Sequence, residues 1–169
     1  MPSTLKLTPS ESVEIRSSTA ETLAVEATYG PGGKRPPAHF HPSQDERFEV
    51  LAGRLSVKVE GKQRELGVGE TIDIARGQLH QMWNPSAEPA PVRWTTSPAL
   101  RTERWFRDVD ALHREGKVGR NGMPGPLAFG VMLSEYRDVF RLAAPDWLLR
   151  PALAGLAAIG RARGYSATP

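Results

Sequence analysis

Apolar and polar residues alternate with a period of two along much of the first 98 residues, as is typical of half-buried β-strands. The alternation is loose over residues 11–30 and clear over residues 55–59, where three aliphatic residues interleave with polar ones. Turn-forming residues separate the runs, and Glu60 and Gly61 are expected to form a tight turn. Many short strands with no helix between them predict an all-β fold, a jelly roll or a barrel.

The period changes to that of α-helices in the last third of the chain. Apolar side chains recur at helical spacing over residues 101–115, and Gly116 is well placed just past the end of this helix. A second apolar stripe follows over residues 129–140, and a third segment begins at Pro145. These segments predict a C-terminal α-helical extension.

The change of period divides the chain into two predicted parts. Residues 1–98 are expected to form a small jelly-roll β-barrel, and residues 99–169 a helical extension packed on the barrel or at a dimer interface. The third helical segment has no charge between Pro151 and Gly160, yet it is too short and interrupted to span a bilayer easily. Large apolar patches are rarely left exposed, so we expect the chain's other helices or a second subunit to cover this segment, and we expect a homodimer. A helix lying on a membrane surface is the disfavoured alternative.

Composition narrows the possible partners. The chain has 169 residues, of which 39% are hydrophobic and 24% charged, and it has no cysteine, so neither a disulfide nor a thiolate metal site can form. Residues 1–98 hold 11 Lys and Arg against 12 Asp and Glu, whereas residues 99–169 hold 11 against 7. The basic excess forms no run, which argues against nucleic-acid binding. The first ten residues do not resemble a signal peptide, so a cytoplasmic location is expected.

Histidines and a glutamate are the strongest candidates for chemistry. His39 and His41 are two residues apart, so on an extended strand both imidazoles leave the same face. Glu46 follows after Pro42 and Ser43, which suit a turn, and a strand beginning there returns its carboxylate to the imidazoles. A second stretch, from residue 69 to residue 84, supplies another imidazole. Such a mixed nitrogen and oxygen set suits a transition metal better than Ca or Mg.

The two stretches also match two sequence patterns. The pattern G-x5-H-x-H-x4-E-x6-G is met by Gly33, His39, His41, Glu46 and Gly53. The pattern G-x5-P-x-G-x2-H-x3-N is met, except at its proline, by Gly69, Gly77, His80 and Asn84. Over roughly residues 12–98 the chain resembles the cupin superfamily, whose two motifs these are. Ala75 stands where the family usually has proline, a residue that shapes a turn and binds no metal.

This resemblance implies a ligand set and a class of function. It implies that His39, His41, Glu46 and His80 ligate one divalent transition metal ion, Fe, Mn, Ni or Zn, inside the β-barrel. Four protein ligands would leave a six-coordinate ion open at two positions, where a small-molecule substrate could bind. We therefore expect a metal-dependent enzyme acting on a small organic molecule, an oxygenase ahead of an isomerase or lyase. Glu46 is also the candidate catalytic base.

An alternative hypothesis is that the protein binds the metal but is not a catalyst. A binding or sensing module would capture a small molecule without turnover, and fold alone does not choose between the two, because function resides in the site. Among other side chains, Met82 shares a strand face with His80 and should lie near the metal. Packing roles are favoured for Tyr29 and Trp94, and His113 is expected to lie away from the metal.

Overall fold

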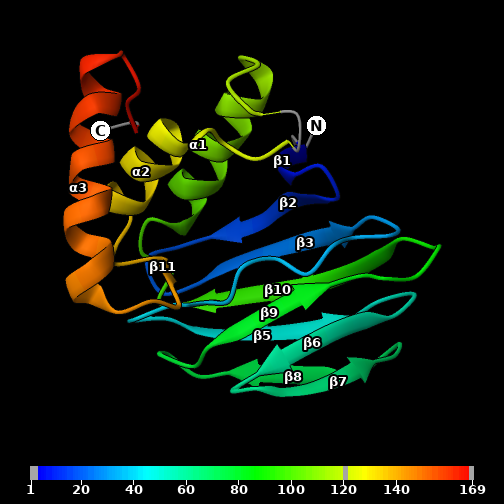
Figure 1. Cartoon of the computed structure of the whole chain (residues 1–169). Coiled ribbons are helices and arrows are strands. Elements are labelled where there is room, and N and C mark those ends of the chain that lie inside the picture. Colours follow the sequence, from blue (N-terminus) through cyan, green and yellow to red (C-terminus); the bar gives the residue numbers. More distant parts are fainter. Residues whose placement is uncertain (1–3, 120–121, 168–169) are drawn as a thin grey trace.

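The computed structural model describes residues 4–119 and 122–167, and it has two antiparallel β-sheets with three α-helices gathered on one side (Figure 1). The larger sheet has the strand order β1 (Thr4–Thr8), β2 (Glu11–Ser18), β3 (Leu23–Tyr29), β10 (Ala90–Ser97), β5 (Asp45–Val50) and β8 (Thr71–Ile74). The smaller sheet has the order β11 (Arg141–Leu142), β4 (His39–Phe40), β9 (His80–Trp83), β6 (Leu55–Val59) and β7 (Lys62–Leu66). The helices are α1 (Thr102–Arg114), α2 (Pro126–Glu135) and α3 (Asp146–Ala162).

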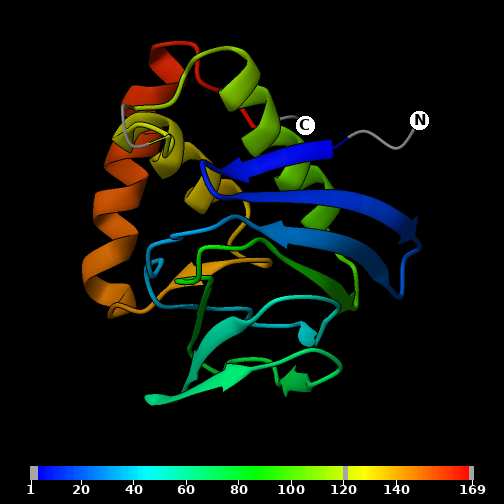
Figure 2. The same cartoon turned by 90° about the vertical axis from the view of Figure 1, so that its right-hand side faces the viewer.

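The two sheets form two layers around one hydrophobic core (Figure 2). Every second residue is buried along β3 and along β10, as the alternating sequence predicts. The core takes Val25 and Val92 from the larger sheet and Leu55 and Val57 from the smaller one. This arrangement of antiparallel strands fits the predicted jelly roll.

The predicted closure into a barrel is not observed. In the part of the chain that the structure describes, no strand pairing joins the two sheets, so the fold is an open jelly roll. The edge strand β7 exposes most of its side chains, and β8 exposes Thr71 and Asp73. Polar and charged side chains at an edge disfavour further pairing. Alternation in a sequence shows which face of a strand is buried, but it does not show whether sheet edges join.

The turn between β6 and β7 illustrates how local sequence fixes strand register. Glu60 and Gly61 have φ angles of 47° and 81°. Two successive positive φ angles form the tight turn that matches the twist of an antiparallel hairpin. Val59 consequently pairs with Lys62. The hairpin predicted here is confirmed.

Helix α1 lies at the predicted position and packs beside β1. Gly116, with a φ of 66°, follows its end as expected. The carboxylate of Asp110 accepts a hydrogen bond from the backbone N–H of Lys6 at 2.9 Å. His113 lies here as well, with Nε2 3.3 Å from the carbonyl oxygen of Leu7. It therefore joins α1 to β1, a strand that the sequence did not predict.

Helices α2 and α3 pack closely because glycines lie at their contact. A Cβ atom at Gly130 would come within 2.6 Å of the Cβ of Leu156. A Cβ atom at Gly160 would come within 2.9 Å of the carbonyl oxygen of Leu127. This close approach accounts for glycines inside helices, where they otherwise cost conformational entropy.

The outer face of α3 is apolar and exposed. Trp147 is 78% exposed, Leu148 55% and Ile159 51%. Among the described residues, no helix is both long and apolar enough to cross a membrane. The second subunit that we expect to cover this face stays a prediction.

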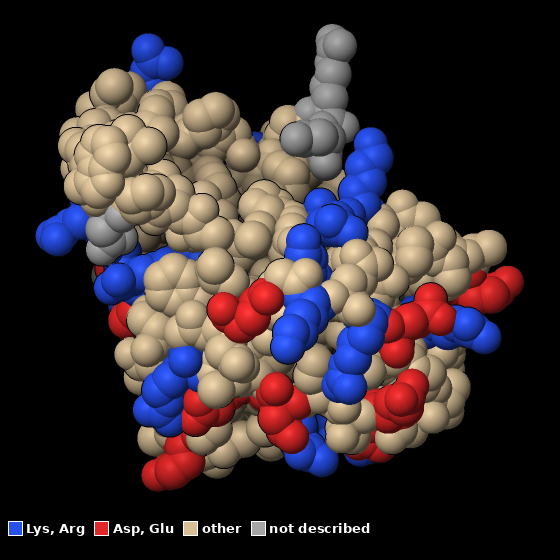
Figure 3. All heavy atoms as spheres, turned by 60° about the horizontal axis from the view of Figure 1, so that its bottom comes forward, with Lys and Arg blue, Asp and Glu red and all other residues tan. Residues whose placement is uncertain are grey.

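The outer surface of the strands is highly charged instead. Basic and acidic side chains are mixed on the face seen in Figure 3. On the strands, Arg47 pairs with Asp73 at 2.8 Å and Arg54 pairs with Glu65 at 2.7 Å. Such exposed pairs contribute little to stability, but they keep this surface hydrated.

The chain returns to the smaller sheet after α2. The second apolar stripe is helical only as far as Glu135, and Arg141 and Leu142 then form β11, which pairs with Phe40 and His39 of β4. The C-terminal part thus adds a strand beside a candidate metal ligand. The division of the chain at residues 98 and 99 stays a prediction.

Candidate metal centre

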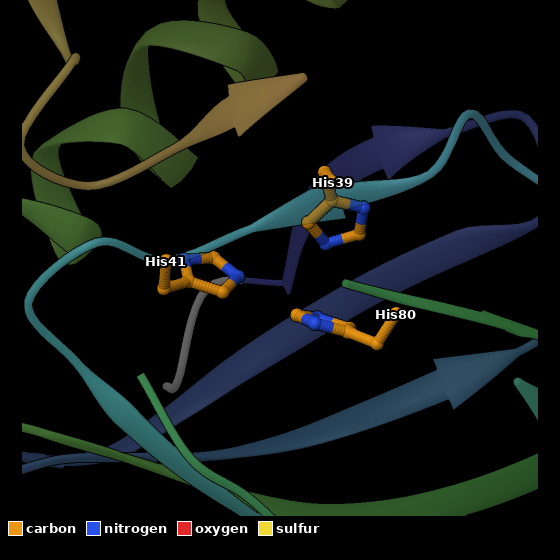
Figure 4. A group of neighbouring side chains, drawn as sticks. All are labelled: His39, His41 and His80. Atoms are coloured by element: carbon orange, nitrogen blue, oxygen red, sulfur yellow. The ribbon is translucent and has the colours of Figure 1, made fainter. Parts of the chain in front are cut away.

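Three histidines of the smaller sheet converge at one point. His39 in β4 and His80 in β9 are direct cross-strand partners, and His41 follows the end of β4. One ring nitrogen of each histidine lies within 4.8 Å of the other two, and the three rings point toward one another (Figure 4). His41 and His80 are buried and His39 is half-buried. The short pairing of β4 with β9 thus produces the cluster.

Glu46 reaches these histidines from β5 in the opposite sheet. Its Oε2 atom lies 3.2 Å from Nε2 of His80 and 3.4 Å from Nε2 of His41. Its Oε1 atom accepts a hydrogen bond from Nε1 of Trp94 at 3.0 Å. The structure therefore brings all four predicted site residues together from two sheets.

Backbone carbonyl groups orient the three imidazoles. The Nδ1 atoms lie 2.6, 3.0 and 3.3 Å from carbonyl oxygens, which belong to Val139 for His41, to Gln78 for His80 and to Pro37 for His39. A carbonyl oxygen can only accept, so each Nδ1 carries the hydrogen and donates it. In a neutral ring, Nε2 then presents its lone pair, as metal ligation requires.

The remaining oxygen of Glu46 provides a test of whether a metal fits. Among the described residues, this buried Oε2 atom has no hydrogen-bond partner. It faces the Nε2 atoms of His41 and His80, and the lone pairs of neutral rings repel a carboxylate. A proton or a cation between these atoms removes the repulsion. Imidazole nitrogens with a carboxylate are usual ligands of divalent transition metals, so the residues fit such an ion.

The protonation states suit the same role. Burial, together with the neighbouring imidazoles, lowers the pKa of His39 to about 3. Burial also lowers the pKa of His41. Burial alone would raise the pKa of Glu46, but the positive charge that His41 and His80 carry when protonated outweighs it and lowers this pKa to about 2. Burial opposes the protonation of His80, yet the adjacent carboxylate raises its pKa. Near neutral pH the carboxylate is ionised, and His39 and His41 are neutral.

The sequence analysis missed three residues around the cluster. Trp94 was assigned to packing, although a buried indole N–H needs a partner and Glu46 is that partner. The carbonyl of Val139 accepts from His41, which is 98 residues away in the chain. The ring of Phe140 stacks on His39 with centroids 4.6 Å apart. Alternation along β10 could have placed Trp94 on the inward face, but no local pattern points to Val139 or Phe140.

A cavity of about 160 Å³ opens beside the histidines. Both sheets and the helical part contribute to its wall, and Met82 lies on it near His80, as expected. Most of the wall is apolar, and its phenylalanine, tryptophan and tyrosine members are Tyr29, Phe48, Trp94, Trp105, Phe106, Phe129 and Phe140. A concave apolar pocket with a few convergent polar groups is typical of a small-molecule site.

Comparison with known proteins identifies the fold family. Residues 25–96 match a family model described as a cupin domain. The structure of KdgF from Halomonas sp. is similar with a TM-score of 0.54 and 20% identity, over 60% of this chain and 92% of that chain. At this identity the likeness shows the fold. Residues 25–96 therefore form a cupin domain, and the resemblance expected from the two motifs is confirmed.

Curated relatives match over shorter stretches. The chain is 33% identical over 75 residues to the tetracenomycin polyketide synthase protein TcmJ of Streptomyces glaucescens, covering 44% of this chain and 50% of that protein. It is 62% identical over 41 residues to the probable oxidoreductase yanE of Aspergillus niger, covering 24% of this chain and 14% of that protein. The chain spans half or less of the length of the curated relatives it matches.

Proposed function

We propose that this protein is a metal-dependent enzyme acting on a small organic molecule, and that it is an oxidoreductase of the oxygenase type. In this proposal His39, His41, Glu46 and His80 hold one divalent transition metal ion, Fe, Mn, Ni or Zn. The observation that carries it is the convergence of three oriented imidazoles and one buried carboxylate in the wall of a mostly apolar cavity. Perturbed titratable groups in such a pocket are typical of active sites.

The names of the relatives support the choice of chemistry. Two matching proteins are named oxidoreductases, and a third is named a polyketide synthase protein. All three names favour chemistry on small organic molecules over a module that only binds them. We carry the oxidoreductase class to this chain because its candidate ligands suit redox-active metals such as Fe and Mn.

The residues of the chain have distinct parts in this proposal. A bound transition metal would supply Lewis acidity that polarises an oxygen atom of the substrate. The carbonyl groups at the Nδ1 atoms keep the imidazoles in one orientation, so the site is preorganised. Glu46, whose pKa is about 2, is ionised at neutral pH, so its Oε2 atom can ligate the metal or, on leaving the metal, accept a proton, while Trp94 holds Oε1. The apolar wall limits the access of water and strengthens these interactions.

Metal analysis and oxygen uptake together test the proposal. Protein reconstituted with Fe or Mn should hold about one ion per chain and should consume oxygen when small phenols or diketones are added. The isosteric change Glu46→Gln should lower the turnover rate by about 100-fold, because it removes the proton acceptor. Glu49→Gln is the matched control, since Glu49 lies on the same strand and pairs with Arg93 outside the cavity.

Two results would count against the proposal. A folded protein that takes up no metal on reconstitution would remove its basis. A fully metallated protein that binds such molecules but consumes no oxygen and converts none of them would indicate a binding module instead.

A further inference from the structure

The cavity beside the histidines has a second polar end. Glu11 in β2 and Tyr29 in β3 line the same cavity as the histidine cluster. They are cross-strand partners, and the Tyr29 hydroxyl lies close enough to the Glu11 carboxylate for each group to shift the pKa of the other. The partners Val13 and Ala27, the next inward pair along these strands, are apolar and buried. Glu11 is thus an acidic residue on the inward face of a sheet.

A structural role alone does not account for this glutamate. Among residues 4–119 and 122–167 no ion pair neutralises it, and an aliphatic residue would extend the apolar face that Val13 begins. Two other polar side chains of the cavity wall already have partners. The hydroxyl oxygen of Thr8 accepts from the N–H of Ser10, and that of Thr102 accepts from the amide of Gln44. Their oxygens are thus already engaged, whereas Glu11 and Tyr29 add a carboxylate and a hydroxyl to the cavity wall.

The aromatic side chains of the cavity wall suit a flat ring. Phe48 and Trp94 are stacked with centroids 5.3 Å apart and planes at 21°, and Trp105 and Phe140 are stacked at 5.3 Å and 14°. A dry cavity of about 150 Å³ is sufficient for one benzene molecule. The cavity here measures about 160 Å³, so one aromatic ring fits.

We infer that Glu11 and Tyr29 form a second binding subsite, which holds one oxygen substituent of a single-ring aromatic ligand while another oxygen faces the histidines. The hydroxyl of Tyr29 can donate to that oxygen, and the carboxylate of Glu11 can accept from it. This inference rests on the proposed function for the role of the histidine end.

The protonation of Glu11 is consistent with this role. Burial and, to a lesser extent, the charge of Glu46 raise its pKa and the nearby Tyr29 hydroxyl lowers it, with a net value of about 7. A carboxyl group with this pKa both donates and accepts hydrogen bonds near neutral pH. The Tyr29 hydroxyl also lies 4.0 Å from the sulfur of Met82, two residues after His80, so the subsite belongs to the same compartment as the cluster.

Paired ligands test the subsite in the full-length, zinc-loaded protein. Zinc has no redox chemistry, so binding can be measured by calorimetry without turnover. The probes are 4-hydroxyacetophenone and acetophenone, which differ by one hydroxyl group. We expect the hydroxyl to tighten binding to the wild type by about 10-fold, as one well-made hydrogen bond does. Tyr29→Phe and Glu11→Met should each reduce this ratio to about 3-fold or less, while Thr28→Val, on the opposite face of β3, should leave it unchanged.

The design separates this inference from the proposed function. A ratio that collapses in both cavity variants, with zinc content and folding unchanged, supports the subsite even if the enzyme assays find no turnover. A ratio near one in the wild type, an unchanged ratio in both variants, or no binding of either probe overturns the subsite. None of these last results would contradict the proposed oxygen-consuming metal centre.

Discussion

The surroundings of the two carboxylates that border the cavity shift their pKa values in opposite directions. Glu46 lies between imidazoles, which outweigh the effect of burial and lower its pKa to about 2. Glu11 lies beside a neutral hydroxyl in a largely apolar wall, and burial raises its pKa to about 7. One cavity therefore holds a permanent anion at one end and a proton-exchanging group at the other. Two carboxyl groups whose pKa values differ in this way commonly have distinct acid, base and binding roles.

The largest expected effect comes from breaking the histidine end. His41→Ala removes one of the two imidazoles that face Oε2 of Glu46. Loss of a direct ligand should weaken metal affinity by more than about 100-fold, because even loss of the groups that orient ligands costs 10–100-fold. Competition with a chromophoric chelator measures the affinity. His113→Ala is the control, since His113 joins α1 to β1 instead.

An affinity within a few-fold of the wild type would contradict the assignment of His41 as a ligand. It would also leave the unpartnered Oε2 atom of Glu46 without an explanation. In that case the proton shared with His80, whose pKa is raised, would be the sole occupant of the site.

The second prediction concerns Glu11 and the pH dependence of the protein's stability. The pKa of Glu11 is raised from its ordinary value of 4.5 to about 7 in the folded protein. Its stabilising contribution is therefore fully present below pH 4.5, and it is lost as the pH rises through 7. The difference in pKa corresponds to about 3 kcal/mol, and the surface that Glu11 keeps toward the cavity reduces our expectation to about 2 kcal/mol.

Glu11→Gln should remove this dependence, because the amide stays neutral. Thermal unfolding of metal-free protein at pH 5 and pH 8 measures it. The wild type should lose stability relative to the variant between these two values. The exposed carboxylate in Glu21→Gln should show no such difference. Parallel losses in wild type and Glu11→Gln would mean that Glu11 titrates as an ordinary surface carboxyl.

The two ends of the cavity also differ in how far the sequence could predict them. His39, His41, Glu46 and His80 belong to short local patterns, so their spacing on strands and turns was sufficient to place them together. The strands, the hairpin at Glu60 and helix α1 followed from periodicity for the same reason. Local spacing carries this kind of information well.

The rest depends on pairings between distant segments. Val139 and Phe140 continue an apolar stripe that reads as helix, and only their contact with His41 and His39 shows that the chain turns back to the sheet. Glu11 was not singled out, because its importance comes from the register that places it opposite Tyr29. The open edges of the two sheets were missed for a similar reason, since closure depends on how sheets meet.

The smallest effect tests whether the indole of Trp94 positions Glu46. Trp94→Phe keeps an aromatic ring in the wall but removes the N–H that donates to Oε1 at 3.0 Å. The carboxylate then loses one of the contacts that fix its direction, and metal affinity should fall by about 10-fold, the lower end of the range for groups that orient ligands. Trp83→Phe is the matched control, because Trp83 is equally buried but contacts Arg35 by a cation–π interaction. Both variants shorten a buried side chain, so both should lower the melting temperature, whereas metal affinity should fall in Trp94→Phe alone. Equal affinities in the two variants would show that the hydrogen bond contributes to packing and not to the metal site.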